Sequence, residues 1–242
     1  MAPRSPRPPA APPDARLGVR AQQTRAAQRV AGSASQEVRL IGGRWKRTPL
    51  PVPTSAGLRP TPARVRETVF NWLGQDLSGW RVLDAFAGSG ALGLEAASRG
   101  AERVTLLERD AALARSLKAV VQRLTQGASA QVGQRIDVLQ SDALAWMAAG
   151  RHTFDLVFLD PPFDEGLFDA ALTAACECVP AGGWVYVEAP HELPWPSVAA
   201  PARGELAWPS LLSRHRHGQA GAVHFHLFQR VASSGEAASR GD

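Results

Sequence analysis

The segment from Val82 to Gly90 constrains the fold of this chain more than any other stretch. It reads Val-Leu-Asp-Ala-Phe-Ala-Gly-Ser-Gly, which predicts an apolar strand that meets an acidic residue and then turns through a small, glycine-rich loop. A helix is predicted from Ala91 to Arg99, and Gly100 ends it. Because glycine lets a ligand approach the backbone closely, this unit is typical of a nucleotide-cofactor site. The carboxylate of Asp84 favours a cationic ligand over a phosphate.

Two later strands also end at acidic residues. An apolar run ends at Glu108, about 20 residues past the glycine loop, where a carboxylate can accept hydrogen bonds from ribose hydroxyls. A second run, residues 154–160, leads into Asp160-Pro161-Pro162-Phe163. The two prolines forbid helix and ladder pairing, so Asp160 and Phe163 are predicted in a stiff loop at the strand's carboxyl end. Open α/β sheets bind their ligands at that edge.

Strands and helices alternate from residue 81 onward, which predicts a parallel sheet with helices on both faces. We expect strands at 81–86, 103–108, 136–140, 154–160 and 184–188, and helices at 91–99, 111–124, after Asp142, and at 167–179. Residues 215–219 and 223–230 predict an antiparallel hairpin, joined near Gly221, that closes one edge. The predicted fold class is α/β: a doubly wound, Rossmann-like sheet, mostly parallel, with a small N-terminal hairpin and helix.

The N-terminal part is predicted to form that hairpin and helix. A strand at 37–41 is followed by a Gly42-Gly43 turn and a second strand through Trp45. Thr61 and Pro62 are typical of a helix N-cap and first helical position, and the helix runs from 63 to 73. We therefore divide the chain into a basic tail predicted to be disordered (1–36), a hairpin and helix (37–79), a domain built on the parallel sheet (80–231) and a C-terminal tail predicted to be disordered (232–242).

The net charge of +5 hides a strong asymmetry. Residues 1–66 hold 13 of the 27 Lys and Arg residues but only two acids, giving +11, whereas residues 67–242 carry −6. A basic arm on an acidic domain is the electrostatic pattern of a polyanion binder. The Pro-, Ala- and Arg-rich tail also has the composition of a targeting segment, but its early prolines oppose an amphipathic helix, which favours an untargeted extension.

Composition argues against a membrane, a disulfide and a metal. No apolar run approaches the roughly 18 residues that span a bilayer, so we expect a soluble, cytoplasmic protein. Cys176 and Cys178 lack the spacing of zinc or redox motifs and are predicted to be reduced thiols. Four histidines at i, i+2 spacing on the two strands of the C-terminal hairpin could cluster and leave a zinc site open, but without cysteine or acidic ligands polar hairpin positions, which could touch RNA, are favoured. These are His215, His217, His224 and His226.

These features together resemble the class I S-adenosylmethionine-dependent methyltransferases. More narrowly, the chain resembles the RsmD family, which methylates the exocyclic N2 of a guanine in 16S ribosomal RNA. The resemblance covers about residues 38 to 230. Its carriers are Arg39–Gly43, Gly57–Thr61, Arg64–Leu73, Asp84–Ala96 and Asp160–Phe163. The tail 1–36 and the Pro/Ala-rich stretch around 190–210 depart from the family pattern.

The resemblance implies a site for each step of methyl transfer. S-adenosylmethionine is the implied cofactor: Asp84 lies near its ammonium, Glu108 at the ribose and Asp142 at the adenine, the last also a possible helix cap. The remaining implied cofactor contacts are Phe86, Gly88, Ser89 and Gly90. Asp160, Pro161, Pro162 and Phe163 are the implied catalytic residues, and Arg44, Arg47, Arg59, Arg64 and Arg66 are expected to contact RNA.

The implied partner is 16S rRNA or the assembling small ribosomal subunit, with the protein acting as a monomer and without metal or membrane. Two alternatives stay open. The Asp-Pro-Pro-Phe chemistry also serves methylation of other planar amino groups, such as adenine N6 in DNA or the glutamine amide of a protein. The chain could also be a non-catalytic RNA-binding assembly factor on the same scaffold, although an intact Asp160 and Glu108 argue against that.

Overall fold

The computed structural model describes residues 38–52, 61–126, 133–150, 152–162, 166–193 and 208–232. By its internal contacts the chain divides into residues 1–36 and 37–242, and every described residue lies in the second unit. The predicted tails and Pro/Ala-rich stretch around 190–210 fall largely outside the described residues. None of the helices within the described ranges is long and apolar enough to cross a bilayer.

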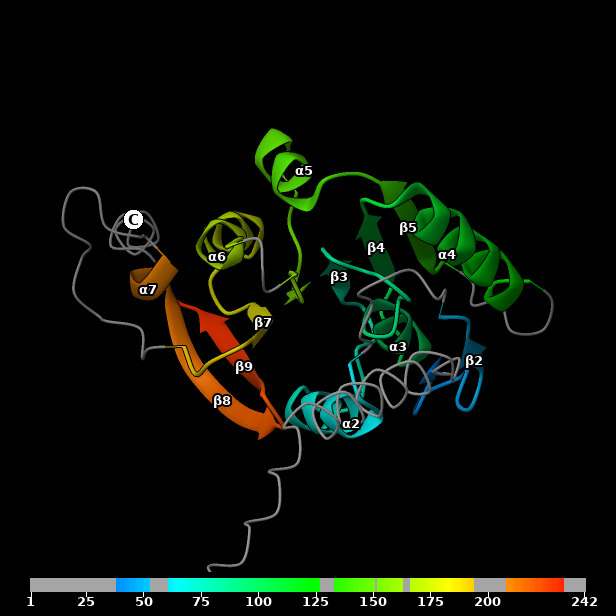
Figure 1. The fold of residues 1–242 in the computed structure, drawn as a ribbon, viewed down its shortest axis with the longest axis horizontal. Coiled ribbons are helices and arrows are strands. Elements are labelled where there is room, and N and C mark those ends of the chain that lie inside the picture. The colour runs from blue at the N-terminus through cyan, green and yellow to red at the C-terminus, as the bar shows by residue number, and fades with distance from the viewer. Residues whose placement is uncertain are drawn as a thin grey trace, which may run out of the picture. The chain divides into compact units, whose positions relative to one another are not determined.

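The described strands form one large sheet and one two-stranded sheet (Figure 1). The large sheet has the order β5-β4-β3-β6-β7-β9-β8, in which β3 to β7 are parallel and β9 and β8 are antiparallel. This confirms the predicted fold class and the C-terminal hairpin. The strands are β3 (Arg81–Asp84), β4 (Arg103–Glu108), β5 (Arg135–Gln140), β6 (Leu156–Leu159), β7 (Trp184–Ala189), β8 (Leu212–Ala220) and β9 (Val223–Arg230).

Helices cover both faces of this sheet, because successive strand residues point to opposite sides. In β3, for example, Val82 belongs to one buried cluster and Leu83 to the other. The first cluster lies under α2 (Ala63–Trp72), α3 (Gly93–Ser98) and α4 (Ala111–Leu124). The second lies under α5 (Ala143–Ala149), α6 (Phe168–Cys178) and α7 (Trp208–Leu211).

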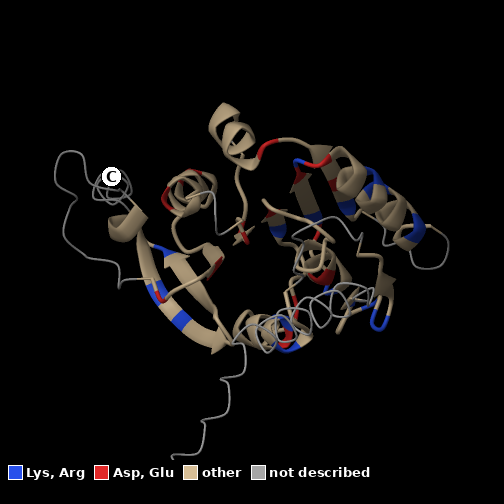
Figure 2. Cartoon of the chain, in the orientation of Figure 1, with Lys and Arg blue, Asp and Glu red and all other residues tan. Residues whose placement is uncertain are grey.

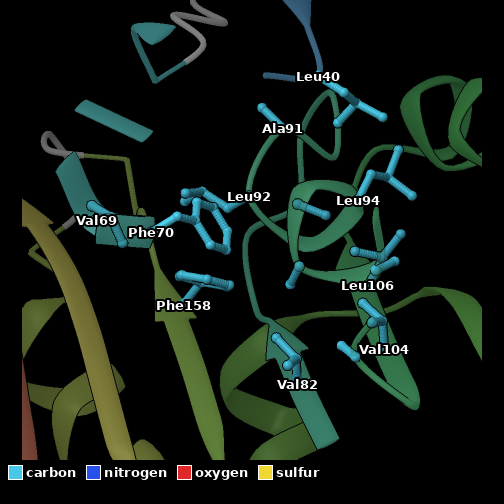
Figure 3. Packing of buried hydrophobic residues seen from close by; sticks show 14 of the residues in the cluster. Leu40, Val69, Phe70, Val82, Ala91, Leu92, Leu94, Val104, Leu106 and Phe158 are labelled. Atoms are coloured by element: carbon cyan, nitrogen blue, oxygen red, sulfur yellow. The ribbon is translucent and has the colours of Figure 1, made fainter. Parts of the chain in front are cut away.

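The N-terminal segment shares the first of these cores. Figure 3 shows Val69 and Phe70 of α2 beside Phe158 of β6, and the Phe70 and Phe158 ring centroids lie 6.0 Å apart. Leu40 and Leu50 of the small hairpin are buried in the same cluster. The hairpin and α2 are therefore packed onto the sheet rather than folded around a core of their own.

The small hairpin differs from its prediction in the second strand. Strands β1 (Val38–Arg39) and β2 (Pro49–Leu50) pair antiparallel, and Trp45 lies in the turn between them. The turn is wider than Gly42-Gly43 because its backbone binds α3: the amide of Arg44 donates to the Ser98 carbonyl at 2.8 Å, and that of Trp45 donates to Ser98 Oγ at 2.9 Å. Hydrogen bonds to Ser98 thus replace the strand pairing that the sequence predicted for residues 44 and 45.

Two helix starts also differ from prediction. Pro62, not Thr61, is the N-cap residue of α2, and no side chain caps it. Helix α3 begins at Gly93 rather than Ala91, because the glycine loop continues through a turn in which Gly88 and Gly90 have φ of 51° and 76°. By contrast, β4 and α4 have the predicted bounds.

A buried charge network joins the N-terminal segment to α3. Glu95 is fully buried and accepts hydrogen bonds from the Ile41 amide at 2.8 Å, Arg99 Nε at 2.9 Å and Arg66 Nη1 at 3.4 Å. Arg66 is 2% exposed and also donates to the carbonyls of Arg39 and Thr61. The guanidinium of Arg66 therefore connects the hairpin, the start of α2 and α3.

Arg66→Ala should lower the free energy of unfolding by about 3–5 kcal/mol, because it leaves the buried Glu95 carboxylate with one partner fewer. Arg81→Ala is the matched control: its ion pair with Asp155 is exposed and should contribute only about 0–1 kcal/mol. Urea unfolding of both variants measures the difference. Equal, small losses would show that the network does not hold the N-terminal segment.

Candidate active site

The glycine loop between β3 and α3 lies at the carboxyl edge of the sheet. The positive φ of Gly88 and Gly90 gives the loop its tight course, which a side chain would strain. The Gly88 amide donates to Glu108 Oε2 at 2.9 Å, and the Gly90 amide donates to the Ala87 carbonyl at 2.6 Å. Ser89 is buried between them, and Phe86 is half-buried.

Glu108 stands beside this loop, as its place at the end of β4 predicts. Its second oxygen, Oε1, accepts from the Asp110 amide at 2.8 Å, so the carboxylate fixes two backbone turns at once. The side chain remains partly exposed, and a carboxylate can accept further hydrogen bonds beyond these two. The geometry thus leaves Glu108 able to receive ribose hydroxyls without losing its hold on the loop.

Asp84 is buried beneath the loop. Its Oδ2 accepts from the Gly93 amide at 2.9 Å, and the carboxyl also bonds the Phe86 backbone. Burial raises the pKa of Asp84 to about 7, and the nearby carboxylates of Glu108 and Glu188 add to the rise, while the two backbone hydrogen bonds oppose it. A buried carboxyl with such a pKa would gain from a bound cation, which favours its ionised form.

Asp160 follows directly after β6, next to β3 in the sheet. Burial raises its pKa well above the usual value, and the neighbouring carboxylates Glu188 and Asp84 raise it further. The Thr61 side chain donates a hydrogen bond to Asp160, which lowers the pKa. Pro161 is buried and Pro162 exposed. Phe163, for which a catalytic role was predicted, lies outside the described residues.

Two residues of this edge were not predicted from the sequence. Glu188 is 4% exposed on β7, and the fully buried Tyr186 donates to its Oε1 at 3.0 Å. Glu188 completes a row of acidic side chains at the carboxyl ends of β3, β6 and β7. The signal was present: residues 184–188 are an apolar strand that meets an acidic residue, the same pattern that indicated Glu108 and Asp160.

Asp142 is the N-cap of α5, where its carboxylate accepts from the Ala145 amide at 2.9 Å. The capping interpretation is thereby confirmed. The side chain is exposed at the end of β5, so a second role at the adenine stays a prediction.

The arginines predicted to contact RNA have different environments. The prediction that Arg66 contacts RNA is wrong. Its side chain is buried and paired with Glu95, so it presents no charge to a phosphate. Arg64, Arg44 and Arg47 are exposed, and the guanidinium of Arg44 lies 4.7 Å from the centre of the Trp45 ring. Arg59 lies outside the described residues.

Three of the four hairpin histidines cluster, as their spacing predicted. His217 stacks on His224 and His226, with centroid distances of 5.4 and 4.7 Å, whereas His215 packs on Trp184. Burial lowers the pKa of His226 to about 4, so this ring is neutral. Across the described residues, no group of three or more potential ligands is arranged to hold a metal ion. Cys176 and Cys178 are both buried and unpaired.

The order of strands and the acidic row at the carboxyl edge define a class I methyltransferase, and solved structures of such enzymes share the fold. A putative methyltransferase of Escherichia coli is 36% identical, with a TM-score of 0.65, over 81% of this chain and 99% of its own. A 16S rRNA N2 G1207 methyltransferase of Thermus thermophilus, solved with AdoMet and guanosine, is 21% identical, with a TM-score of 0.56, over 80% of this chain and 49% of its own. At 21% identity, the similarity to the Thermus thermophilus enzyme shows a shared fold only.

Sequence comparison gives the family. A family model described as "Conserved hypothetical protein 95" matches residues 38–229. The chain is 39% identical to ribosomal RNA small subunit methyltransferase D of Escherichia coli K12, covering 83% of this chain and 93% of the relative. It is 43% identical to the protein of that name from Haemophilus influenzae, covering 67% and 83%. The chain belongs to this methyltransferase D family, and S-adenosylmethionine is its cofactor.

The residues of the edge fit this cofactor. The buried Asp84 suits its ammonium group, and the loop at Gly88 and Gly90 leaves the backbone open to a close approach. Glu108 has acceptor capacity left for the ribose. Bound there, the cofactor supplies an electrophilic methyl group on a sulfonium, and the acidic row complements that positive charge.

Cofactor affinity should fall as the pH drops through about 7, because a protonated Asp84 loses its attraction for the ammonium group. Calorimetric titration with S-adenosylmethionine between about pH 5.5 and 8 tests this, with Asp84→Asn as the comparison. The variant should bind more weakly at pH 8, and its affinity should vary less with pH. Parallel pH profiles for the two proteins would contradict the assignment.

Proposed function

We propose that this protein transfers a methyl group from S-adenosylmethionine to the exocyclic N2 of a guanine in 16S rRNA. The observation that carries the proposal is the position of Asp160-Pro161 at the carboxyl edge, beside Asp84 and the glycine loop, in a chain of the methyltransferase D family. This arrangement supports an amine acceptor site next to a cofactor site.

The chemistry requires orientation of a weak nucleophile. A guanine amino group has its lone pair delocalised into the ring. The two N–H groups donate hydrogen bonds to the Asp160 carboxylate and the Pro161 carbonyl, which turns the lone pair toward the methyl donor. Catalysis then rests on positioning and electrostatic complementarity rather than on a covalent intermediate.

Asp160 also provides a destination for the proton that the amine must lose. Its raised pKa makes it a better base than an ordinary aspartate once it is ionised. The positive charge of the bound cofactor favours that ionised form, since an opposite charge nearby lowers a carboxyl pKa. Phe163 offers a face for an unstacked base, and Arg44, Arg47, Arg59 and Arg64 contact the RNA backbone.

The substrate is tested by labelled-methyl incorporation into naked 16S rRNA, assembled small subunits and duplex DNA, followed by nucleoside analysis. We expect N2-methylguanine in one of the two rRNA samples and no label in DNA. Label in DNA adenine or in protein would overturn the guanine assignment. Absence of cofactor binding would favour a non-catalytic assembly factor.

Asp160→Ala should lower the methyl-transfer rate roughly 10²–10³-fold, as expected for the loss of one transition-state acceptor. Asp155→Ala is the matched control, since Asp155 lies at the amino end of the same strand and pairs with Arg81. Single-turnover rates and cofactor affinity are measured for both. A near-normal rate for Asp160→Ala would remove this carboxylate from the mechanism.

A further inference from the structure

The β1–β2 hairpin and α4 carry several cationic side chains and no carboxylate of their own. Residues 38–52 and 111–124 contain no Asp or Glu. Seven cationic side chains of these segments are exposed in the structure. We call this surface the α4–hairpin face, and its cations are Arg39, Arg44, Lys46, Arg47, Arg115, Lys118 and Arg123.

The two elements form one continuous surface. Arg123 Nη2 of α4 donates to the Pro49 carbonyl of β2 at 3.4 Å. Pro51 lines a narrow hollow together with Leu113 and Leu117 of α4 and with Gly88 and Ser89 of the glycine loop. Figure 2 shows basic segments on α4 and on the turn of the hairpin. The surface therefore extends from the catalytic edge outward.

The sequence of α4 separates its charge from its core. Leu113, Leu117, Val120 and Leu124 are buried against the sheet. At 100° per residue, Arg115 and Lys118 fall on the opposite side of the helix, about 4.5 Å apart along its axis, and Arg123 lies on the flank. In the described part of the chain, no carboxylate lies within ion-pair distance of Arg115 or Lys118. Their charge is available to a partner.

The side chains of the α4–hairpin face favour double-stranded over single-stranded RNA as the partner. Single-stranded RNA is usually held by aromatic side chains on which bases stack. The α4–hairpin face offers no such platform, since Val231, on neither element, is the only large apolar residue that is exposed among those described. Cations spread over two elements suit the phosphates of a double helix, which is recognised by its backbone and shape.

We propose that the α4–hairpin face binds the phosphate backbone of an rRNA duplex that flanks the acceptor guanine. The inference rests on the proposed function, and it extends the RNA contact from the hairpin arginines Arg44 and Arg47 to the exposed side of α4. The duplex would hold the RNA in register while the unstacked guanine reaches Asp160.

The test compares Arg115→Ala/Lys118→Ala with Arg81→Ala/Arg103→Ala. The control removes two exposed arginines at the amino ends of β3 and β4, at the edge of the sheet opposite the catalytic edge. Binding is measured against salt for a 16S rRNA stem-loop that carries the acceptor guanine, and for the loop strand alone. Cofactor affinity and transfer at saturating RNA are measured for each protein.

We expect the α4 variant to bind the stem-loop about tenfold more weakly at low salt, with a salt slope reduced by about 2, since each lost phosphate contact removes about one unit. The control should match the wild type, and the loop strand alone should bind both variants equally. Transfer at saturating stem-loop should persist in the α4 variant.

Two outcomes would overturn the proposal. An unchanged stem-loop affinity and slope in the α4 variant would show that no phosphate meets this face. An equal loss for the loop strand alone would assign the face to single-stranded RNA. Either result leaves the proposed function standing if the wild-type protein forms N2-methylguanine in naked 16S rRNA or in assembled small subunits, whereas a wild-type protein that methylates neither sample would reject the proposed function instead.

Discussion

The packing of the N-terminal segment onto the sheet depends on the hydrogen bonds that the buried Glu95 carboxylate accepts. Glu95 lies in the helix that follows the glycine loop and accepts hydrogen bonds from Ile41, Arg66 and Arg99. Ion pairs of this kind add little net stability over a packed apolar core, but breaking one by removing a partner is costly. Glu95 therefore specifies where the hairpin and α2 pack against α3, through Ile41 and Arg66.

That docking has a chemical consequence at the other end of the network. Arg66 donates to the Thr61 carbonyl, and the Thr61 side chain donates to Asp160. Helix α3, the N-terminal segment and Asp160 are thus connected through Glu95, Arg66 and Thr61. A buried carboxylate on α3 is in this way linked to a hydrogen bond that lowers the pKa of the proposed acceptor residue.

Much of the fold was predictable because its signals are local. Apolar runs that meet Asp84, Glu108 and Asp160 mark strands, and parallel strands must present those ends at one edge. The row of acids was predicted except for Glu188, whose strand end carries the same pattern. The predicted strand bounds were wrong where hydrogen bonds to another element decide them, as in the hairpin turn whose backbone amides donate to Ser98 of α3.

Arg66 shows the limit of such reasoning. It follows Arg64 in a basic segment, so charge alone predicted contact with RNA, yet it lies on the buried side of α2 with Val69 and Phe70. The missing information is a partner 29 residues away. A lone acid, Glu95, within the small and apolar helix at 93–98 was the signal that a buried cation would be needed.

The pH dependence of the single-turnover methyl-transfer rate in Thr61→Val tests this account most directly, with Thr68→Val on the exposed side of α2 as control. Because the Thr61 hydrogen bond lowers the pKa of Asp160, its loss should move the acidic limb of the profile to higher pH. The Thr68→Val profile should match the wild type. An unchanged limb in Thr61→Val would show that the N-terminal segment does not tune the acceptor site.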